Sequence, residues 1–258
     1  MKPGRFRPPS GLRDDQFARI EKLLPGRPGY VGRDSVVGNR VFVETVIWKF
    51  RTGVSWRDLP ESTGHWKNTH KRFSRWAEKG VWERLFRALA DDPDNEYAMI
   101  DATIVRAHQH SAGAQKKLGV DQAIGRSRGG LTTKIHAIVD ALGNPLELSL
   151  TGGQVHDIQQ AEPLTARIDP SAMLGDKGYD ADRYISYLQA RGIQVVIPPK
   201  ANRKIKRECD FVLYCERNLV ERFFNVIKHF RGIATRYEKT ARNFLAGLHL
   251  VCALIWLK

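Results

Sequence analysis

The hydrophobic period of this chain changes near residue 97, and that change limits the available folds more than any other feature. Upstream, apolar residues recur at the spacing of helices; downstream, short runs typical of β-strands alternate with helical stretches. Between them lies Asp91-Asp92-Pro93-Asp94-Asn95-Glu96, in which four acids surround a proline that stops a helix. The sequence therefore predicts a helical domain over residues 1–90, a linker over 91–96 and a second domain over 97–258.

The N-terminal domain is predicted to be a small basic helical bundle. Helix-like stretches cover 16–24, 40–51, 63–77 and 81–90. Five of the six tryptophans lie here, and we expect most of them to anchor the core. Residues 1–90 carry 19 basic and 9 acidic side chains, a net charge of +10. Such a unit suits a helix-turn-helix-like DNA-binding domain, although basic surface helices are common.

The C-terminal domain alternates strands with helices. Strands are predicted at 97–105, 132–139, 146–150, 172–174 and 195–197, and helices at 158–168, 181–191 and 217–230. A polar loop of 25 residues, 106–130, separates the first two strands. The order βββ-α-β-α-β-α predicts an α/β fold with a mixed sheet and helices on both faces. The apolar run 244–257 is too short for a membrane span, so it is predicted to be a buried helix.

Two acids follow short apolar runs, Asp101 after Met99-Ile100 and Asp176 after Leu174-Gly175. Ligands of open α/β sheets gather at strand ends, so acids placed there are candidate site residues. A lone aspartate at a strand end is nevertheless more often a turn former or a helix cap. Asp180 and Asp182, close by, are each expected to be a cap or a surface residue.

A third acid, Glu221, lies on a strongly amphipathic predicted helix. Tyr214, Arg217, Glu221 and Lys228 fall within about 60° of one another on a helical wheel, and the apolar residues occupy the other side. The simplest interpretation is a solvated face with one weak Arg217–Glu221 pair. The alternative is an acid set among basic groups that face the sheet, as a metal and phosphate site would require.

The spacing Tyr214-x2-Arg217-x3-Glu221-x6-Lys228 matches the signature around the catalytic glutamate of bacterial insertion-sequence transposases. Met99-Ile100-Asp101-Ala102-Thr103 and Gly175-Asp176-Lys177-Gly178-Tyr179 resemble the segments that hold their two aspartates. Over about residues 97–240 the chain thus resembles DDE-class transposases, close to the family named after insertion sequence five. The resemblance implies an RNase H-like fold and a metal-binding catalytic triad of Asp101, Asp176 and Glu221. It also implies that Tyr214, Arg217 and Lys228 contact DNA phosphates.

Three carboxylates suit the chemistry of cutting DNA. Two divalent cations can activate the attacking oxygen and stabilise the leaving one. Mg²⁺ prefers oxygen ligands, and Mn²⁺ is a possible substitute. We expect two ions, with Asp101 bridging both, Asp176 on one and Glu221 on the other.

The overall charge points to a polyanionic partner. The chain carries 42 basic and 28 acidic side chains, a net charge of +14, with a pI near 9.9. A basic run precedes the Glu221 helix and is predicted to contact DNA, the alternative being a solvated loop: Lys200, Arg203, Lys204, Lys206 and Arg207. With three cysteines and no apolar leader segment, a cytoplasmic, nucleoid-associated bacterial protein is expected.

These features together predict a metal-dependent transposase, that is, an endonuclease and polynucleotidyl transferase. It would bind the double-stranded ends of an insertion sequence, cut them and join their 3′-hydroxyls to target DNA. Because two ends must meet, a homodimer or a larger synaptic complex on DNA is expected, with no membrane partner. Two alternatives stay open: an RNase H-like nuclease without strand transfer, and a non-catalytic DNA-binding protein.

Overall fold

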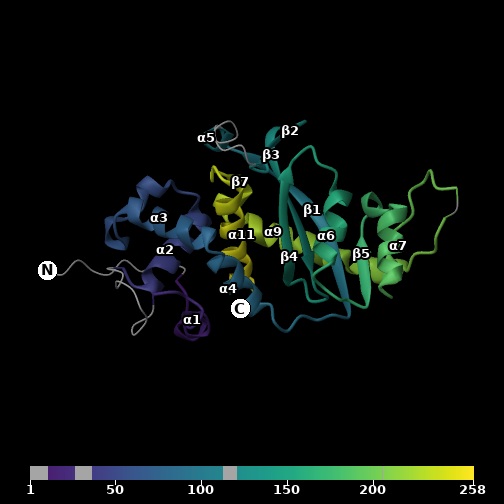
Figure 1. Ribbon diagram of the computed structural model, residues 1–258, viewed down its shortest axis with the longest axis horizontal. Coiled ribbons are helices and arrows are strands. Elements are labelled where there is room, and N and C mark those ends of the chain that lie inside the picture. Colours follow the sequence, from purple (N-terminus) through teal and green to yellow (C-terminus); the bar gives the residue numbers. More distant parts are fainter. Residues whose placement is uncertain (1–10, 27–36, 113–120, 205) are drawn as a thin grey trace.

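The computed structural model describes residues 11–26, 37–112, 121–204 and 206–258 (Figure 1). Its N-terminal region is helical, as the sequence predicts. The helices are α1 (Asp14–Glu21), α2 (Asn39–Thr52), α3 (Trp66–Glu78) and α4 (Val81–Leu89), with short 3-10 turns at Trp56–Asp58 and Glu61–Thr63. Gly53 ends α2 in the left-handed region at φ 74°, which glycine adopts without the strain that a side chain would bring.

A mixed sheet, covered by helices, forms the rest of the described fold. Its strands are β1 (Tyr97–Ala107), β2 (Gly125–Ser127), β3 (Gly130–Val139), β4 (Pro145–Gly152), β5 (Ala172–Gly175), β6 (Gln194–Val196) and β7 (Thr235–Arg236). The main order is β4-β3-β1-β5-β6, with β2 beside the start of β3 and β7 beside the end of β1. The β4–β3 and β3–β1 pairs are antiparallel, whereas β1–β5 and β5–β6 are parallel. This topology confirms the prediction of an RNase H-like mixed sheet.

Two elements differ from the prediction around the first strand. β1 continues to Ala107 because it pairs with β3 as far as Arg106 and with β7 at Arg106 and Ala107. Asp101 lies in the middle of this strand, inside the run predicted over 97–105. The predicted loop 106–130 contains the one-turn helix α5 (Gln109–Ala112) and β2, which forms a hairpin with β3; residues 113–120 of that loop lie outside the described ones.

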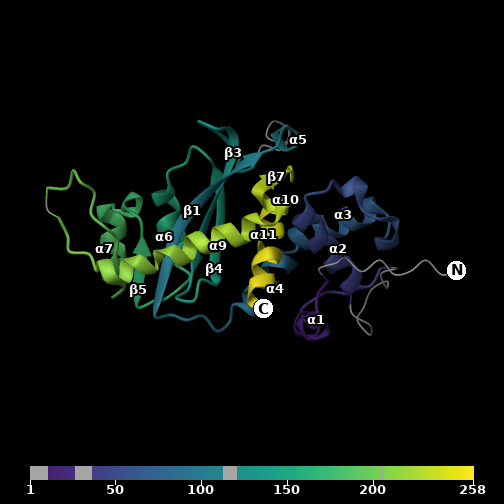
Figure 2. The same cartoon turned by 180° about the vertical axis from the view of Figure 1, so that it is seen from behind.

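Helices lie on both faces of the sheet, as Figures 1 and 2 show from opposite sides. Residues 157–165 form a 3-10 turn (Asp157–Gln160) and the short α6 (Ala161–Thr165), so the helix predicted over 158–168 is shorter than expected. α6 and α7 (Asp182–Ala190) pack on one face. On the other lie α9 (Asn218–Lys228) and α11 (Ala241–Trp256), with α10 (Arg231–Ala234) between them in the chain.

One apolar core joins the N-terminal helices to the sheet. α11 packs against α3 and α4 on one side and against β4 on the other, so side chains of both regions form the same buried cluster. The run 244–257 is the buried helix that the sequence predicts, and no helix within the described ranges is long and apolar enough to cross a membrane. The division into domains at 91–96 stays a prediction.

Candidate active site

The pairing of β1 with β5 brings Asp101 and Asp176 next to each other. Ile100 and Gly175 are partners in the parallel register, and the two aspartates follow them, Asp101 within β1 and Asp176 directly after the end of β5. Because parallel strands lie about 4.8 Å apart, the two side chains leave the same face of the sheet as neighbours. Asp176 also opens a 3-10 turn, Lys177–Tyr179, where its Oδ1 accepts a hydrogen bond of 2.7 Å from the Gly178 N–H.

Arg217 joins Asp101 to Glu221. Its Nη1 donates to Asp101 Oδ2 at 2.8 Å, and its Nη2 donates to Glu221 Oε1 at 2.6 Å. The bond to Glu221 is the i,i+4 pair that the helical spacing predicts. The bond to Asp101 spans 116 positions and fixes the position of the helix over β1. One guanidinium thus holds two of the three predicted catalytic acids together.

The helix that carries Arg217 and Glu221 is assembled from three short pieces. α8 (Phe211–Tyr214) leads through the 3-10 turn Cys215–Arg217 into α9, so the helical segment begins earlier than residue 217. Asp210 starts it, because its carboxylate accepts hydrogen bonds from the N–H groups of Val212 and Leu213. Buried Val220, Phe223, Phe224 and Ile227 then fix which side of α9 faces the sheet.

Burial and charge oppose each other at Asp101. Its side chain is only 20% exposed, and this burial raises the carboxyl pKa above its ordinary value. The Ala102 N–H and Arg217 act in the opposite direction, while the charge of Asp176 raises the pKa further. Burial also works against the charge of Arg217, but Asp101 and Glu221 raise its pKa overall. Arg217 thus favours the charged form of Asp101, but burial outweighs it and leaves the pKa of Asp101 raised overall.

The donor set suits a hard metal ion, but the acids are not gathered around one position. Among the described residues, no group of three or more His, Cys, Asp or Glu side chains is placed to hold a metal. Asp101 and Glu221 instead bind the Arg217 guanidinium, and the side chain of Glu221 is 58% exposed. Asp101 and Glu221 already bind one cation, and the carboxylate of Asp176 lies just after the neighbouring strand β5. These oxygen ligands fit the chemistry of Mg²⁺.

The other two residues of the predicted stripe differ in their surroundings. Lys228 reaches β1, where its Nζ donates to Thr103 Oγ1 at 2.5 Å, and burial lowers its pKa. Thr103 shares the strand face of Asp101, so Arg217 and Lys228 both contact that face. Tyr214 is half-buried against the apolar core, with its ring edge toward Phe211 at a centroid distance of 6.3 Å.

The basic run forms a loop tied to Asp180, which corrects our expectation for that residue. Asp180 is 2% exposed and accepts hydrogen bonds from the Lys200 N–H at 2.8 Å, from Arg203 Nε at 2.5 Å and from Arg207. Asp182 is an exposed partner of Arg203, as expected of a surface residue.

Lys204 and Lys206 are exposed and Lys200 is half-buried. Lys206 and Arg207, with Lys177 beside Asp176, line a hollow of about 700 Å³.

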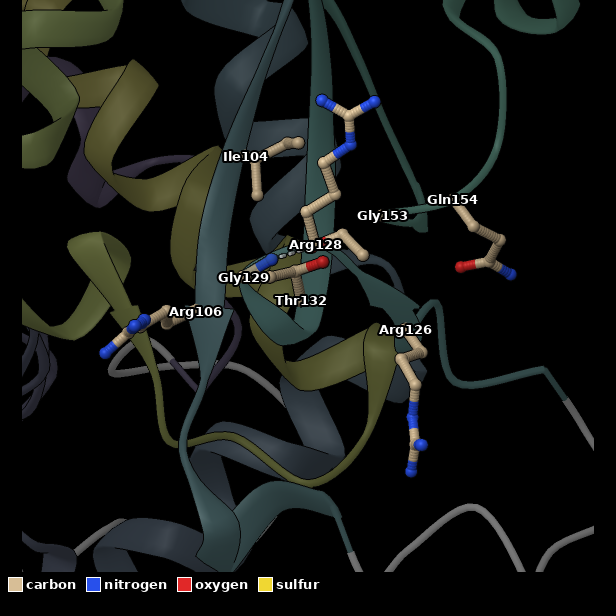
Figure 3. A pocket seen from close by; sticks show the side chains of 9 residues that line it. Ile104, Arg106, Arg126, Arg128, Gly129, Thr132, Gly153 and Gln154 are labelled. Carbon is tan, nitrogen blue, oxygen red and sulfur yellow. Dashed lines mark hydrogen bonds between the residues drawn. The ribbon is translucent and has the colours of Figure 1, made fainter.

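Three arginines that sequence reasoning missed surround another hollow, of about 560 Å³: Arg106, Arg126 and Arg128. Ile104 and Arg106 alternate along β1 with Asp101 and Thr103, so this hollow lies on the opposite face of the sheet. Figure 3 shows the three guanidinium groups pointing in different directions, which makes an open cationic surface and not a closed anion site. A sequence pattern that could have revealed them is a basic hairpin turn inside the predicted loop, in the stretch Gly125-Arg126-Ser127-Arg128-Gly129-Gly130.

Comparisons with known proteins find similarity to transposases. Residues 12–86 match the family described as "Putative transposase of IS4/5 family", and residues 93–256 match "Transposase DDE domain". A Brucella ovis protein named "Putative transposase for insertion sequence element IS6501" is 39% identical over 131 residues, which are 50% of this chain and 100% of the relative. The uncharacterized protein y4sN of Sinorhizobium fredii is 46% identical over 110 residues, 42% of this chain and 86% of its own. A piggyBac transposase synaptic complex with hairpin DNA aligns with 76% of this chain and 48% of its own, at 13% identity and a TM-score of 0.39. Because the DDE match alone covers more than half of its length, the chain belongs to the family of transposases with a DDE domain.

Proposed function

We propose that this transposase binds the ends of its insertion sequence, cuts them with Asp101, Asp176 and Glu221, and joins the 3′-hydroxyl ends to target DNA. The observation that carries the proposal is the Arg217 bridge between Asp101 and Glu221, with Asp176 directly after the end of the adjacent strand β5. The bridge unites charged side chains that are more than a hundred positions apart in the sequence.

Asp101, Asp176 and Glu221 would hold the divalent cations, Mg²⁺ or in its place Mn²⁺. Two such ions, when bound, activate the attacking oxygen and stabilise the leaving oxygen of a phosphodiester. Arg217 and Lys228 offer positive charge to phosphate oxygens from the same face of β1. The Tyr214 hydroxyl is suited to donating a hydrogen bond to the same backbone. Three unneutralised acids would repel the substrate, so cation binding and DNA binding support each other.

The proposed partners are the double-stranded element ends and the target DNA, bound by a homodimer or a larger synaptic complex. The net charge of +14 supports strong contact with phosphates, and the basic helical segment, residues 1–90, would recognise the ends. We assign the protein to the bacterial cytoplasm and nucleoid, where its substrate is.

The test measures DNA cleavage and DNA binding separately in variants of the three acids. Asp101→Asn, Asp176→Asn and Glu221→Gln each remove one anionic ligand and nearly preserve shape. We expect unchanged or slightly tighter binding of end DNA, because a phosphate is repelled less. Cleavage in Mg²⁺ should fall at least about 100-fold, since mutation of a residue that merely hydrogen-bonds to a metal ligand can already lower activity by that factor.

Asp182→Asn is the control, because this exposed acid pairs only at the surface with Arg203 and Arg207. It should cut end DNA at the wild-type rate. A triad variant that nicks end DNA at near wild-type rate would refute the catalytic assignment. Cleavage without any strand-transfer product would favour the nuclease alternative.

A further inference from the structure

A cavity of about 1080 Å³ lies away from the three acids, between the N-terminal helices and the end of the sheet. One wall comes from the end of α2, the turn after it and α3. The other comes from His108, α5, the segment 237–240 after β7, and the start of α11. Neither Asp101, Asp176 nor Glu221 lines it, so it is separate from the candidate active site.

Aromatic rings line both walls of this cavity. On the first wall, the Trp56 ring lies 5.1 Å from the His70 ring, with Trp66 nearby on α3. On the second, the His108 ring lies 4.9 Å from that of Tyr237, which is 38% exposed. Flat rings that face a hollow are the usual surfaces on which unpaired bases stack.

A buried acceptor without a partner adds a specific polar contact. Asn243 lines the cavity and is 7% exposed; its Nδ2 donates to Ser74 Oγ at 2.9 Å. Its Oδ1 is buried and has no hydrogen-bond partner among the residues that the structure describes. A buried acceptor left unpaired is costly, so a ligand that supplies an N–H gains affinity once the Asn243 amide turns toward the cavity, since Oδ1 is inaccessible as it stands. The edge of a nucleobase supplies such a group.

The charge of the cavity is positive at its rim. Arg57, Lys239 and Arg242 line it and are exposed, and Arg242 makes a surface pair with Glu78 at 3.3 Å. The lining acid Glu238 is buried and neutralised, because it binds Lys49 and accepts a bond of 3.0 Å from Trp56 Nε1. The same contacts hold the Trp56 ring in place. An anionic group entering from solvent would meet only cations at this rim among the described lining residues.

We propose that this cavity binds one unpaired nucleotide of a DNA strand, and this assignment rests on the proposed function. Its base would stack against the aromatic walls and donate to Asn243 Oδ1, while its phosphate would contact the cations of the rim. The cavity is thus a second DNA site, which recognises a nucleotide that has left the double helix.

The test compares two DNAs that differ by one nucleotide: a fully paired duplex and the same duplex with a single unpaired 2-aminopurine. Full-length protein should bind the second about tenfold more tightly and quench its fluorescence by stacking. Trp66→Ala and Tyr237→Ala should each lose the preference and the quenching, but keep the affinity for paired duplex within about twofold. Tyr187→Ala is the matched control; Tyr187 lies on α7 and packs against Tyr184 and Arg191.

Each outcome has a separate meaning. Equal affinity of wild-type protein for the two duplexes overturns the inference, and so does a preference that survives in both variants. Equal loss of binding to both DNAs in the variants would mean that the cavity contacts only phosphates, which also overturns it. Self-association that is lost in Tyr237→Ala, without any preference for unpaired DNA, would identify a contact between copies of the chain instead. Failure of the wild-type protein to bind any DNA would refute the proposed function itself.

Discussion

Asp180 and Asp182 are two positions apart, yet their surroundings are opposite. The Asp180 side chain is fully buried and binds Arg203, Arg207 and the Lys200 N–H, whereas that of Asp182 is 83% exposed. Burial alone would raise the pKa of Asp180, but the hydrogen bonds from Arg203, the Lys200 N–H and Arg207 lower it to about 2. Asp180 is thus the anchor of the basic loop beside the candidate active site.

Asp180→Asn should lower the free energy of unfolding by about 2–3 kcal/mol, because the loop loses its charged bonds to a buried acceptor. The matched Asp182→Asn should cost less than about 1 kcal/mol. The pKa of Asp180 is lower in the folded state, so its charge stabilises the fold above about pH 4, and this contribution is lost as the pH falls toward 2. Urea denaturation at pH 6 and pH 3 measures both effects. Equal losses for the two variants at pH 6 would contradict the anchoring role.

Residue-level prediction from sequence succeeded where helical geometry fixes the outcome. The spacing of Arg217 and Glu221 requires them to share a helix face, and the structure pairs them at 2.6 Å. The spacing could not reveal that Arg217 also binds Asp101, since that contact depends on how α9 crosses β1. Nor could it reveal the burial of Asp180, whose partners follow 20 to 27 positions later. The metal-binding role of the triad stays a prediction.

Among the elements, strand lengths were harder to predict than helix positions. The order of strands and helices along the chain agrees with the predicted alternation, and five strand positions agree with the predicted runs. The end of β1 depends on β7, a strand of two residues supplied from 235–236, which no local pattern indicates. The β2–β3 hairpin was likewise hidden in a stretch of glycine and arginine that reads as a loop.

The loop anchored by Asp180 gives a refined prediction for DNA binding. Its exposed or half-buried lysines, Lys200, Lys204 and Lys206, are the residues best placed for phosphates, while Arg203 and Arg207 hold the loop to Asp180. Changing the three lysines to glutamine should flatten the slope of log K against log salt by up to about 2.7, or about 0.9 for each lost contact.

The control for this experiment carries the same change of net charge elsewhere. Arg167, Arg231 and Lys258 are exposed and lie outside both the loop and the segment 1–90. Their replacement by glutamine should leave the salt slope nearly unchanged, as fluorescence anisotropy titrations at several salt concentrations would measure. If both triple variants flatten the slope equally, the loop has no special role and only total charge matters.

At the scale of the whole molecule, the N-terminal helices are built into the same core as the sheet. Arg87 of α4 binds the buried Glu147 of β4 at 2.7 Å, and Lys49 of α2 binds the buried Glu238 before α11. The Lys49–Glu238 pair is buried on both sides, and removal of one partner of such a pair costs several kcal/mol. These contacts join the proposed end-recognition region to the proposed catalytic region, so loss of either pair is expected to destabilise both regions.

Gly247 tests this coupling, because α11 meets α2 there. A Cβ atom at Gly247 would lie 2.2 Å from Cζ of Phe50, a fully buried ring that also lies against Gly232. Gly247→Ala should therefore destabilise the protein by about 1–3 kcal/mol through overpacking. Calorimetry should record one transition for the whole chain, lowered by roughly 3 °C or more. Gly129→Ala, whose added Cβ meets its nearest neighbour at an ordinary 3.8 Å, should melt like the wild type. Two separate transitions, with only one lowered in Gly247→Ala, would mean that the helical region and the sheet unfold independently despite their shared core.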